Sequence, residues 1–297
     1  MIADDILLPF QTDRSNLRGR LIRLGPVVNA ILCRHDYPEP VARLLAQALA
    51  LATLLGGALK YEGVFTLQAV GKGAVNLVVA DYTSDGGMRG YAQFDPARIA
   101  ELAAATDGGA GASVPQLLGG GHLAFTVDQG PDTERYQGIV AITGPTLADC
   151  VHHYFRQSEQ LETVIRLGVG RSTADGRWRA GGIMCQRLPT PGATEDSEDD
   201  WRRTVGLVAS ARDHELLDPD LPPDRLLYRL FHEDGIRAYA AKPVADRCRC
   251  SRERVVQTLR AIAPDSLDEF KIDGRIVVTC EFCNTAYPFS DADLAAL

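Results

Sequence analysis

The stretch that most constrains the fold is a nearly uninterrupted apolar run that begins at Pro40 and ends at Gly56-Gly57. Proline suits the first turn of a helix and glycine ends one, so we expect a single helix over 41–55. Twelve of those fifteen residues are apolar. A helix that is apolar on nearly every side must be covered on nearly every side. We therefore expect sheets or helices to pack against both of its faces.

The sequence after this helix has the alternation and punctuation typical of antiparallel strands. Residues 64–70 and 74–80 predict two strands joined by a glycine turn. Further strands are expected at 90–94, 122–127 and 137–142, and a second helix at about 146–157. The predicted fold class is therefore α+β, with a buried central helix between antiparallel or mixed sheets.

Composition narrows the class of protein. The 297 residues are enough for about two domains, and the net charge of −8 disfavours general attraction to nucleic acid or anionic membranes. Asp4 and Asp5 stand where an export signal would carry Lys or Arg. The apolar stretch 44–59 is broken by polar residues and is shorter than the roughly 18 residues that a membrane span needs. We expect a cytoplasmic protein with no membrane segment.

A change in composition marks a second region. Residues 188–200 are rich in Pro, Thr and Asp, and five of the six residues 195–200 are carboxylates. Clustered like charges without apolar partners predict a solvated linker, which in the simplest interpretation is only a flexible joint. Apolar residues then recur at helical spacing and predict short amphipathic helices that bury one face. The predicted domains are 1–187 (α+β core), 188–245 (acidic linker and helices) and 246–297 (a small C-terminal module).

Cysteine spacing gives the strongest chemical signal. The chain has seven cysteines, an odd number that argues against a secreted disulfide framework and favours metal or redox use in a reducing compartment. Four of them form two close pairs, Cys248-Arg-Cys250 and Cys280-Glu-Phe-Cys283. Four thiolates suit the tetrahedral preference of Zn²⁺, so we predict one Zn²⁺ per chain. The scattered cysteines are expected to be small buried apolar residues: Cys33, Cys150 and Cys185.

The sequence around the cysteine pairs predicts how they are presented. Asp273-Gly274 is a hairpin turn signal before a strand over 275–279, which delivers Cys280 and Cys283 to a knuckle. Ser251 can cap a helix that runs to about residue 262. A helix N-terminus and nearby cations favour anionic sulfur, so these thiols should stay thiolate after metal loss. The cations are Arg247, Arg249, Arg252 and Arg254.

The energies make this module a plausible switch. Structural zinc contributes about 10–16 kcal/mol to small modules, whereas whole domains are stable by only about 5–15 kcal/mol. Oxidation of four thiolates to two disulfides would release the metal and remove most of what holds residues 246–297 together. We expect the half-covered helices after Trp201 to lose a packing partner as well. Exposed apolar helix faces are what a chaperone needs to hold unfolding proteins.

The cysteine module resembles that of the heat-shock protein 33 family of bacterial redox-regulated holdase chaperones. The residues that carry the resemblance are Cys248-Arg-Cys250-Ser-Arg-Glu-Arg254 and Cys280-Glu-Phe-Cys283-Asn-Thr-Ala-Tyr-Pro-Phe289. Upstream segments resemble the family in the same order, and the match covers nearly the whole chain. These segments are Met88-Arg-Gly90, Glu134-Arg-Tyr-Gln-Gly138, Tyr154-Phe-Arg-Gln-Ser-Glu-Gln160, Ala180-Gly-Gly182 and Tyr228-Arg-Leu-Phe-His-Glu233.

The resemblance carries specific implications. Cys248, Cys250, Cys280 and Cys283 would ligate zinc when reduced and pair as Cys248–Cys250 and Cys280–Cys283 when oxidised. The oxidised form would be a homodimer that binds unfolded client proteins, and the reduced form an inactive monomer. Candidates for client binding, although such residues are more often core, are Trp201, Val205, Val208, Leu227, Leu230 and Phe231. The chain departs from the family at Asn284, where Gly is expected in some members, and in its acidic run.

Two other functions are open to a chain with this cysteine set. The four arginines near Cys248 could form a phosphate patch in a zinc-dependent nucleic-acid-binding protein. Residues 246–297 carry seven Lys or Arg and nine Asp or Glu, however, and this balance disfavours nucleic acid. A thiol oxidoreductase would place its Cys-x-x-Cys after the first strand of a βαβ unit. No hydrolase or phosphate-loop motif is present, so we expect a protein that is not an enzyme.

Overall fold

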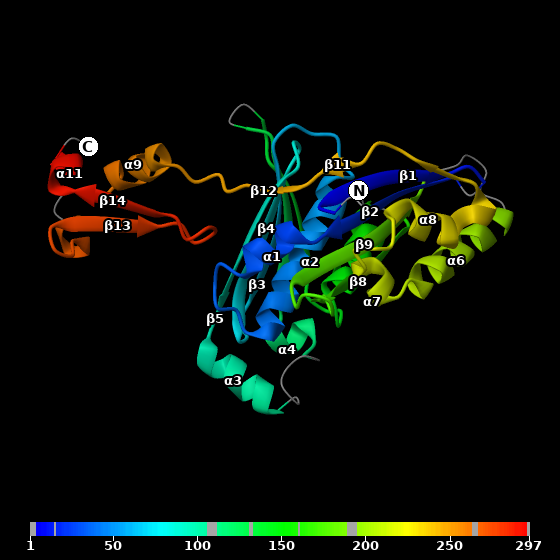
Figure 1. The fold of residues 1–297 in the computed structure, drawn as a ribbon, viewed down its shortest axis with the longest axis horizontal. Helices are drawn as coiled ribbons and strands as arrows, with labels where there is room; N and C mark the ends of the chain where they lie inside the picture. The colour runs from blue at the N-terminus through cyan, green and yellow to red at the C-terminus, as the bar shows by residue number, and fades with distance from the viewer. Residues whose placement is uncertain are drawn as a thin grey trace. The chain divides into compact units, whose positions relative to one another are not determined.

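The computed structural model describes residues 4–14, 16–105, 112–130, 133–159, 161–188, 195–262 and 267–295. The chain divides into two compact units, residues 1–246 and residues 247–297 (Figure 1). The first unit holds the apolar helix and two large sheets. The second holds all four clustered cysteines and a two-stranded sheet.

One sheet of the first unit contains the strands that the sequence predicts. Its spatial order is β12 (Ala245–Asp246), β5 (Gly87–Phe94), β4 (Val75–Thr83), β3 (Val64–Gly71), β6 (Gly121–Asp128) and β7 (Tyr136–Ala141). All neighbours are antiparallel except β12, which runs parallel to β5, so the sheet is mixed as expected. We refer to it as the first sheet. The predicted glycine turn joins β3 to β4.

The opposite sheet is built from segments far apart in the sequence, and the strand signals predicted none of it. Its order is β10 (Ile236–Ala238), β1 (Ile6–Thr12), β2 (Leu17–Leu24), β9 (Trp178–Arg187) and β8 (Thr163–Arg171), with β11 (Lys242–Pro243) also paired to β1. Every pairing in it is antiparallel. We refer to it as the second sheet.

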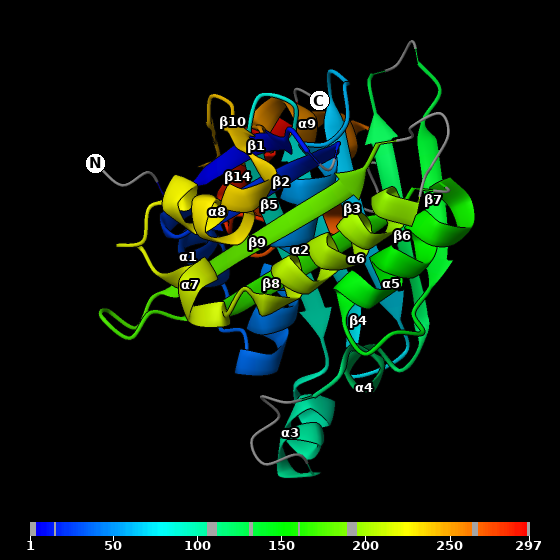
Figure 2. The same cartoon turned by 90° about the vertical axis from the view of Figure 1, so that its right-hand side faces the viewer.

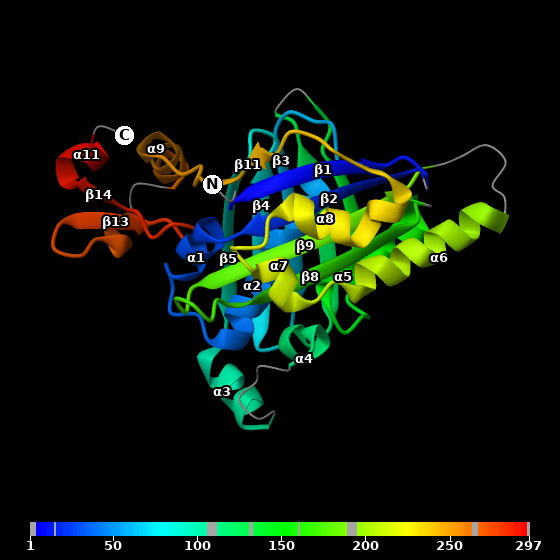
Figure 3. The same cartoon turned by 45° about the vertical axis from the view of Figure 1, so that its right-hand side comes forward.

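The predicted apolar helix is α2 (Glu39–Gly56), and it lies between the two sheets (Figure 3). It contacts β3, β4 and β5 of the first sheet and β2, β8 and β9 of the second. Leu45, Leu49 and Ala52 are fully buried. α2 is long and apolar enough to cross a membrane, but 83% of that apolar window is buried here, as expected for a central core helix. Coverage from both sides is therefore what the apolar run required.

Shorter helices close the ends of the sandwich. They are α1 (Pro26–Leu32), α3 (Pro96–Ala105), α4 (Val114–Leu118) and α5 (Leu147–Tyr154). α5 is the predicted second helix, capped by Thr146, whose hydroxyl accepts a hydrogen bond from the Asp149 backbone N–H. It continues into a π-helical turn, Phe155–Glu159.

Three helices cover the outer face of the second sheet (Figure 2). They are α6 (Glu195–Ser210), α7 (Asp213–Leu217) and α8 (Pro223–Phe231), and a 3₁₀ turn, His232–Asp234, follows. We call this group the helical cover. The prediction of a linker through 195–200 was wrong, because these residues form the first turns of α6. Carboxylates are favoured there because the N-terminal end of the helix dipole is positive. Residues 189–194 lie outside the described residues.

The apolar faces of the helices in the helical cover are buried against the second sheet. Val208, Leu227 and Phe231 are fully buried, and the Phe231 ring lies 5.6 Å from the Phe10 ring of the second sheet. Leu230 is buried too, Trp201 is partly buried, and Val205 is 37% exposed. The packing partner of these helices is therefore the second sheet of the same unit, which the sequence did not indicate.

Two residues of the second sheet hold the cover in place. A Cβ at Gly181 would lie 2.3 Å from the Leu216 carbonyl oxygen, so the lack of a side chain lets α7 approach the strand. Arg23 is 1% exposed and donates to the carbonyl oxygens of Leu221 and Glu215. These contacts fix the position of the cover through backbone atoms as well as through apolar packing.

The second unit is small. Its elements are α9 (Arg252–Arg260), a 3₁₀ turn (Asp268–Phe270), β13 (Arg275–Thr279), β14 (Ala286–Ser290) and α11 (Asp291–Ala295). The predicted turn at Asp273-Gly274 forms, with φ of 50° and 71°. Strand β13 pairs with β14, a pairing that the sequence did not indicate. Across the predicted turn, the described residues form only one β-bridge, between Ile272 and Arg275. Among the described residues its buried apolar cluster is Leu259, Leu267, Ile276 and Phe289.

Acid should destabilise the first unit through His152. Its Nε2 accepts a 2.8 Å hydrogen bond from the Ile165 backbone N–H, and burial lowers the pKa of His152, with Asp149 opposing and Arg156 adding to the shift. The contribution of neutral His152 to stability is complete above the unfolded-state pKa of about 6.5. It is lost as the pH falls from that value through the lower pKa of the folded state. We expect His152→Gln, which does not titrate, to remove up to about 1.4 kcal/mol per pH unit of this dependence.

Urea midpoints between pH 7 and pH 5 measure this effect, with exposed His122→Gln as the matched control. An unchanged pH slope in His152→Gln would contradict the assignment.

Candidate metal centre

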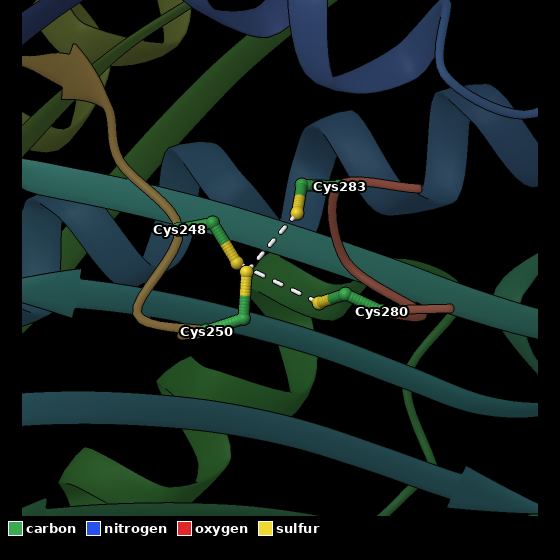
Figure 4. A group of neighbouring side chains, drawn as sticks. All are labelled: Cys248, Cys250, Cys280 and Cys283. Carbon is green, nitrogen blue, oxygen red and sulfur yellow. Dashed lines mark hydrogen bonds between the residues drawn. The ribbon is translucent and has the colours of Figure 1, made fainter. Parts of the chain in front are cut away.

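The four predicted cysteines come together from two separate segments of the second unit (Figure 4). Cys248 and Cys250 lie in the extended segment just before α9. Cys280 and Cys283 lie in the turn between β13 and β14. The antiparallel hairpin and the start of α9 therefore position one pair each, and the knuckle expected for the second pair forms.

The sulfur atoms have the spacing of a four-coordinate metal site. Cys248 Sγ lies 3.7 Å from Cys280 Sγ, and Cys250 Sγ lies 3.3 Å from Cys283 Sγ. All four sulfurs fall within 4.8 Å of one another. A tetrahedron with metal–sulfur bonds of about 2.3 Å has edges of about 3.8 Å. The four cysteines can therefore hold one metal ion, and a set of four soft thiolate donors fits Zn²⁺.

Backbone hydrogen bonds shape both halves of the site. The Ser251 hydroxyl accepts from the Arg254 backbone N–H at 3.3 Å and caps α9, as predicted. The Asn284 N–H donates to the Cys280 carbonyl at 2.8 Å, and the Cys280 N–H donates to the Thr285 carbonyl at 3.0 Å. The turn that carries the second pair is thus closed by its own backbone hydrogen bonds.

The expectation that the protein itself keeps all these thiols ionised was wrong. Burial raises the pKa of Cys250 to about 12, and it also raises the pKa of Cys280. At Cys283 burial acts in the same direction, but hydrogen bonds with the hydroxyl and backbone N–H of Thr285 outweigh it and lower the pKa to about 6. The protein environment therefore favours the thiolate at Cys283 and disfavours it at Cys250 and Cys280, and a bound divalent cation would favour the thiolate form of its ligands.

The positions of two arginines explain part of the difference between the expected ionisation of the thiols and these pKa shifts. Arg252 turns to the other side of the module, where its guanidinium lies 4.2 Å from the Phe289 ring centroid and donates to the Pro288 carbonyl and to Asp293. Arg254 donates to the Arg249 carbonyl at 2.8 Å. These two cations hold α9 and the loop in place and do not line up as a free phosphate patch.

Tyr287 is a site residue that the sequence reasoning missed. Its hydroxyl donates to Cys250 Sγ at 3.1 Å, and this contact is the largest cause of a Tyr287 pKa raised to about 12. Such a second layer of hydrogen bonds orients ligands and tunes their basicity. The sequence does place Tyr287 and Phe289 two residues apart, on the same face of a strand. The pairing of β14 with β13 was needed to show that this face serves the metal site.

The three other cysteines lie apart from this site. Cys150 and Cys185 are fully buried, as predicted, and burial raises the pKa of Cys185 strongly. Cys33 is exposed, so its predicted burial was wrong. It follows the last residue of the seven-residue helix α1 and falls outside the face of that helix that packs on the core.

Asn284 tests how the turn fixes the metal ligands. Its φ is 56°, in the left-handed region where Gly and Asn are tolerated and β-branched residues are not. We expect Asn284→Gly to leave metal affinity within about twofold and Asn284→Val to lower it at least tenfold, because the strain costs about 1–3 kcal/mol. Competition with a chromophoric zinc chelator measures both. Equal affinities for the Gly and Val variants would contradict this role.

Comparison with known proteins agrees with the fold. The family model described as Hsp33 protein matches residues 5–290. The 33 kDa chaperonin of Caulobacter vibrioides is 44% identical over 96% of this chain and 95% of its own length. That of Pseudomonas syringae pv. tomato is 38% identical over 99% and 93%. A crystal structure of a 33 kDa chaperonin from Thermotoga maritima matches with a TM-score of 0.82 at 24% identity, covering 98% of this chain and 97% of that one. The chain therefore belongs to the Hsp33 family.

Proposed function

We propose that this protein is a redox-regulated holdase chaperone that keeps unfolding and oxidatively damaged proteins from aggregating. Family membership supports a chaperone role, and a chaperonin is not a class of enzyme. The observation that carries the regulatory part is the set of four cysteine sulfurs within 4.8 Å of one another. We place the protein in the cytoplasm, where thiols are kept reduced until oxidative stress.

The resident ion in this proposal is one Zn²⁺, held by Cys248, Cys250, Cys280 and Cys283. Bound zinc would supply a cross-link between the segment before α9 and the β13–β14 turn. The second unit needs such a link because its described buried cluster has only four apolar side chains. Small modules of this kind owe their folding to the metal.

Oxidation would exchange this cross-link for two local disulfides, Cys248–Cys250 and Cys280–Cys283. Each disulfide connects residues that are already close in sequence, so neither replaces the link between the two segments. At each thiolate pair, one peroxide molecule would accept two electrons and, with two protons from solvent, become two water molecules. One S–S bond would form as the O–O bond breaks, and the oxidised sulfurs would no longer hold zinc. We infer that the second unit then unfolds and that the segment 188–245 is released with it.

A continuous strap supports coupling between the metal ligands and the helical cover. After α8 the chain pairs with β1 through β10 and β11, crosses to β5 through β12, and reaches Cys248 two residues later. Asp246 at the end of this strap forms a bidentate ion pair with Arg34, which lies in the turn after α1. Release of the strap would uncover the second sheet beneath the helices.

The proposed client surface follows from that release. Val208, Leu227, Leu230 and Phe231 are buried between the cover and the second sheet, so they could meet a client only after the cover detaches. Trp201 and Val205 lie nearer the solvent. Exposed apolar surface of this extent also favours self-association, in line with a homodimer when oxidised and a monomer when reduced.

One titration tests the proposal. Reduced, zinc-loaded protein is treated with increasing peroxide, and released zinc, free thiols and suppression of aggregation of a thermally unfolding enzyme are followed on the same samples. We expect about one zinc released per four thiols lost, and aggregation suppression that rises in step. Cys33→Ser, at an exposed cysteine outside the cluster, is the matched control and should behave as the native chain does.

Zinc release without gain of aggregation suppression would refute the chaperone switch. Full suppression by the reduced, zinc-loaded chain would refute regulation by oxidation.

A further inference from the structure

An apolar cavity of about 390 Å³ lies at the C-terminal end of α2 between the two sheets. This volume is in the range of small-molecule sites. Both sheets, the end of α2 and the segment after α5 line it. Apolar lining residues include Leu55, Phe65, Phe125, Val127, Phe155 and Leu161.

Aromatic rings give this cavity a fixed wall. The Phe65 and Phe125 rings stack at 6.5 Å, Phe125 lies 5.1 Å from Tyr154, and Tyr154 lies 5.8 Å from Phe155. Phe65, Phe125 and Tyr154 are buried, so their rotamers are held by packing. The mouth is different, because Leu59 is 49% exposed and Tyr136 is 57% exposed. Large apolar side chains left in water at a cavity mouth indicate a surface that another molecule covers.

A hydrogen-bonded cluster engages Glu159, the one carboxylate among the described residues that line the cavity. The Tyr136 hydroxyl donates to Glu159 Oε1 at 2.8 Å, the Tyr154 hydroxyl donates to the same oxygen at 2.7 Å, and the two hydroxyls lie 2.9 Å apart. Burial raises the pKa of Tyr154, which keeps this group a donor. Glu159 belongs to the π-helical turn, a feature often found at functional sites. The carboxylate is therefore engaged by the protein.

The cations of the same region are not engaged in this way. Arg18 and Lys60 line the apolar cavity. Lys60 and Lys242 line an adjoining cleft of about 680 Å³, where Glu62 is the one acidic residue among the described lining residues. In the described parts of the chain none of these three cations forms a salt bridge, and the Arg18 Nε donates to the neutral Gln186 amide at 3.2 Å. Glu159 is held by the two tyrosines and does not pair with these cations. Among the described residues, the three positive groups therefore have no carboxylate partner.

The apolar cavity and the cationic cleft adjoin, since Leu59, Lys60, Tyr61 and Gln129 line both. We propose that the two together bind a single-chain amphiphile with an anionic head, a long-chain fatty acid or a lysophosphatidate. The hydrocarbon chain occupies the aromatic-walled cavity, and the carboxylate or phosphate lies against Lys60, within reach of the cleft that Lys242 lines. A cationic amphiphile would meet uncompensated lysines, and a neutral one would leave them without a partner.

Displacement of the fluorescent fatty acid cis-parinarate from the reduced, zinc-loaded full chain tests this site. Competitors below their micelle concentrations are palmitate, palmitoyl lysophosphatidate and hexadecanol. We expect saturable displacement by at least one anionic competitor at a concentration at least tenfold lower than hexadecanol requires. Whether palmitate or the phosphate competes better identifies the head group, and either result supports the site. Because the protein is reduced, the outcome does not depend on the redox switch.

Variants separate this site from non-specific binding. Lys60→Glu, at an exposed position, should remove the preference for anionic competitors, and Ala58→Trp should weaken all competitors at least tenfold by filling the cavity. Lys72→Glu makes the same charge change at an exposed position away from both cavities and should leave binding unchanged. Thermal unfolding confirms that each variant folds. Absence of saturable binding, equal affinity for hexadecanol, or equal weakening by Lys72→Glu overturns the proposal.

Discussion

A chain carrying Cys250→Ser is expected to lose bound zinc and the folded second unit while the α+β core of the first unit, residues 1–187, stays folded. Cys250 Sγ lies 3.3 Å from Cys283 Sγ and accepts the Tyr287 hydrogen bond, so it is central to the cluster. A serine hydroxyl does not ionise to replace a thiolate ligand at neutral pH. Structural zinc contributes about 10–16 kcal/mol, far more than the four buried apolar side chains of this unit can replace.

Metal analysis and a proton–nitrogen NMR spectrum measure this outcome. We expect zinc content to fall from one per chain to near zero, and the dispersed signals of residues 247–295 to collapse. Signals of the α+β core, residues 1–187, should persist because this core has its own buried cluster between the two sheets, whereas signals of 188–245 should change because the proposed function releases that segment. Cys33→Ser, at an exposed cysteine outside the cluster, is the control. A Cys250→Ser chain that retains zinc and dispersed signals would show that this cysteine is not a required ligand.

Phe231→Ala should destabilise the helical cover by about 3–5 kcal/mol, the usual cost of removing a fully buried Phe side chain. Phe231 is 0% exposed, and its ring packs 5.6 Å from Phe10 of the second sheet. Loss of this contact would raise the population of detached cover without any oxidant. Under the proposed function, the reduced Phe231→Ala chain should therefore suppress aggregation more than the reduced native chain does.

Hydrogen exchange of amides in α6, α7 and α8 reports the opening of the cover directly. The matched control is Tyr228→Ala on the same helix, because Tyr228 is 62% exposed and its removal leaves the cluster under the cover intact. Faster exchange in Phe231→Ala without any gain in aggregation suppression would separate the stability role from the client surface. Unchanged exchange would contradict the packing role itself.

The parts of the fold that the sequence predicts are those decided within a short stretch of chain. Helix α2 follows from its apolar composition, and β3 to β7 follow from alternation and nearby glycine turns. Three neighbouring pairs in that run, β3–β4, β4–β5 and β6–β7, are joined by short connections, so the local pattern contains most of the information for these pairs, whereas the pairing of β3 with β6 is not local. The cysteine spacing is local in the same sense, because residue type alone sets the donor chemistry.

The second sheet was not predicted because its pairings are not local. Strand β2 pairs with β9 across more than 150 residues, and both strands depart from simple alternation. β2 carries Arg18, Arg20 and the buried Arg23, whose apolar surroundings are acceptable only because the helical cover supplies carbonyl partners. β9 carries Gly181, a weak strand former that permits close approach of α7.

The same division between local pattern and long-range contact is seen at single residues, namely in the acidic run 195–200, at Cys33 and at Tyr287. Local charge density predicts a solvated linker at 195–200, but the dipole of a helix whose later turns pack on the second sheet accommodates those carboxylates. Cysteine composition predicts burial of Cys33, but only the packing of α1 decides which face is covered. The contact between Tyr287 and Cys250 depends on β14 pairing with β13.

The sequence by itself determined the central helix, most of one sheet and the four thiolate donors, because composition and short-range spacing are enough to decide these features. Only the tertiary structure decided what covers the amphipathic helices, which side chains support the metal ligands, and where an apolar cavity meets unpaired cations. These features depend on contacts between segments far apart in the chain, and no local pattern records which distant residue will fill a given space.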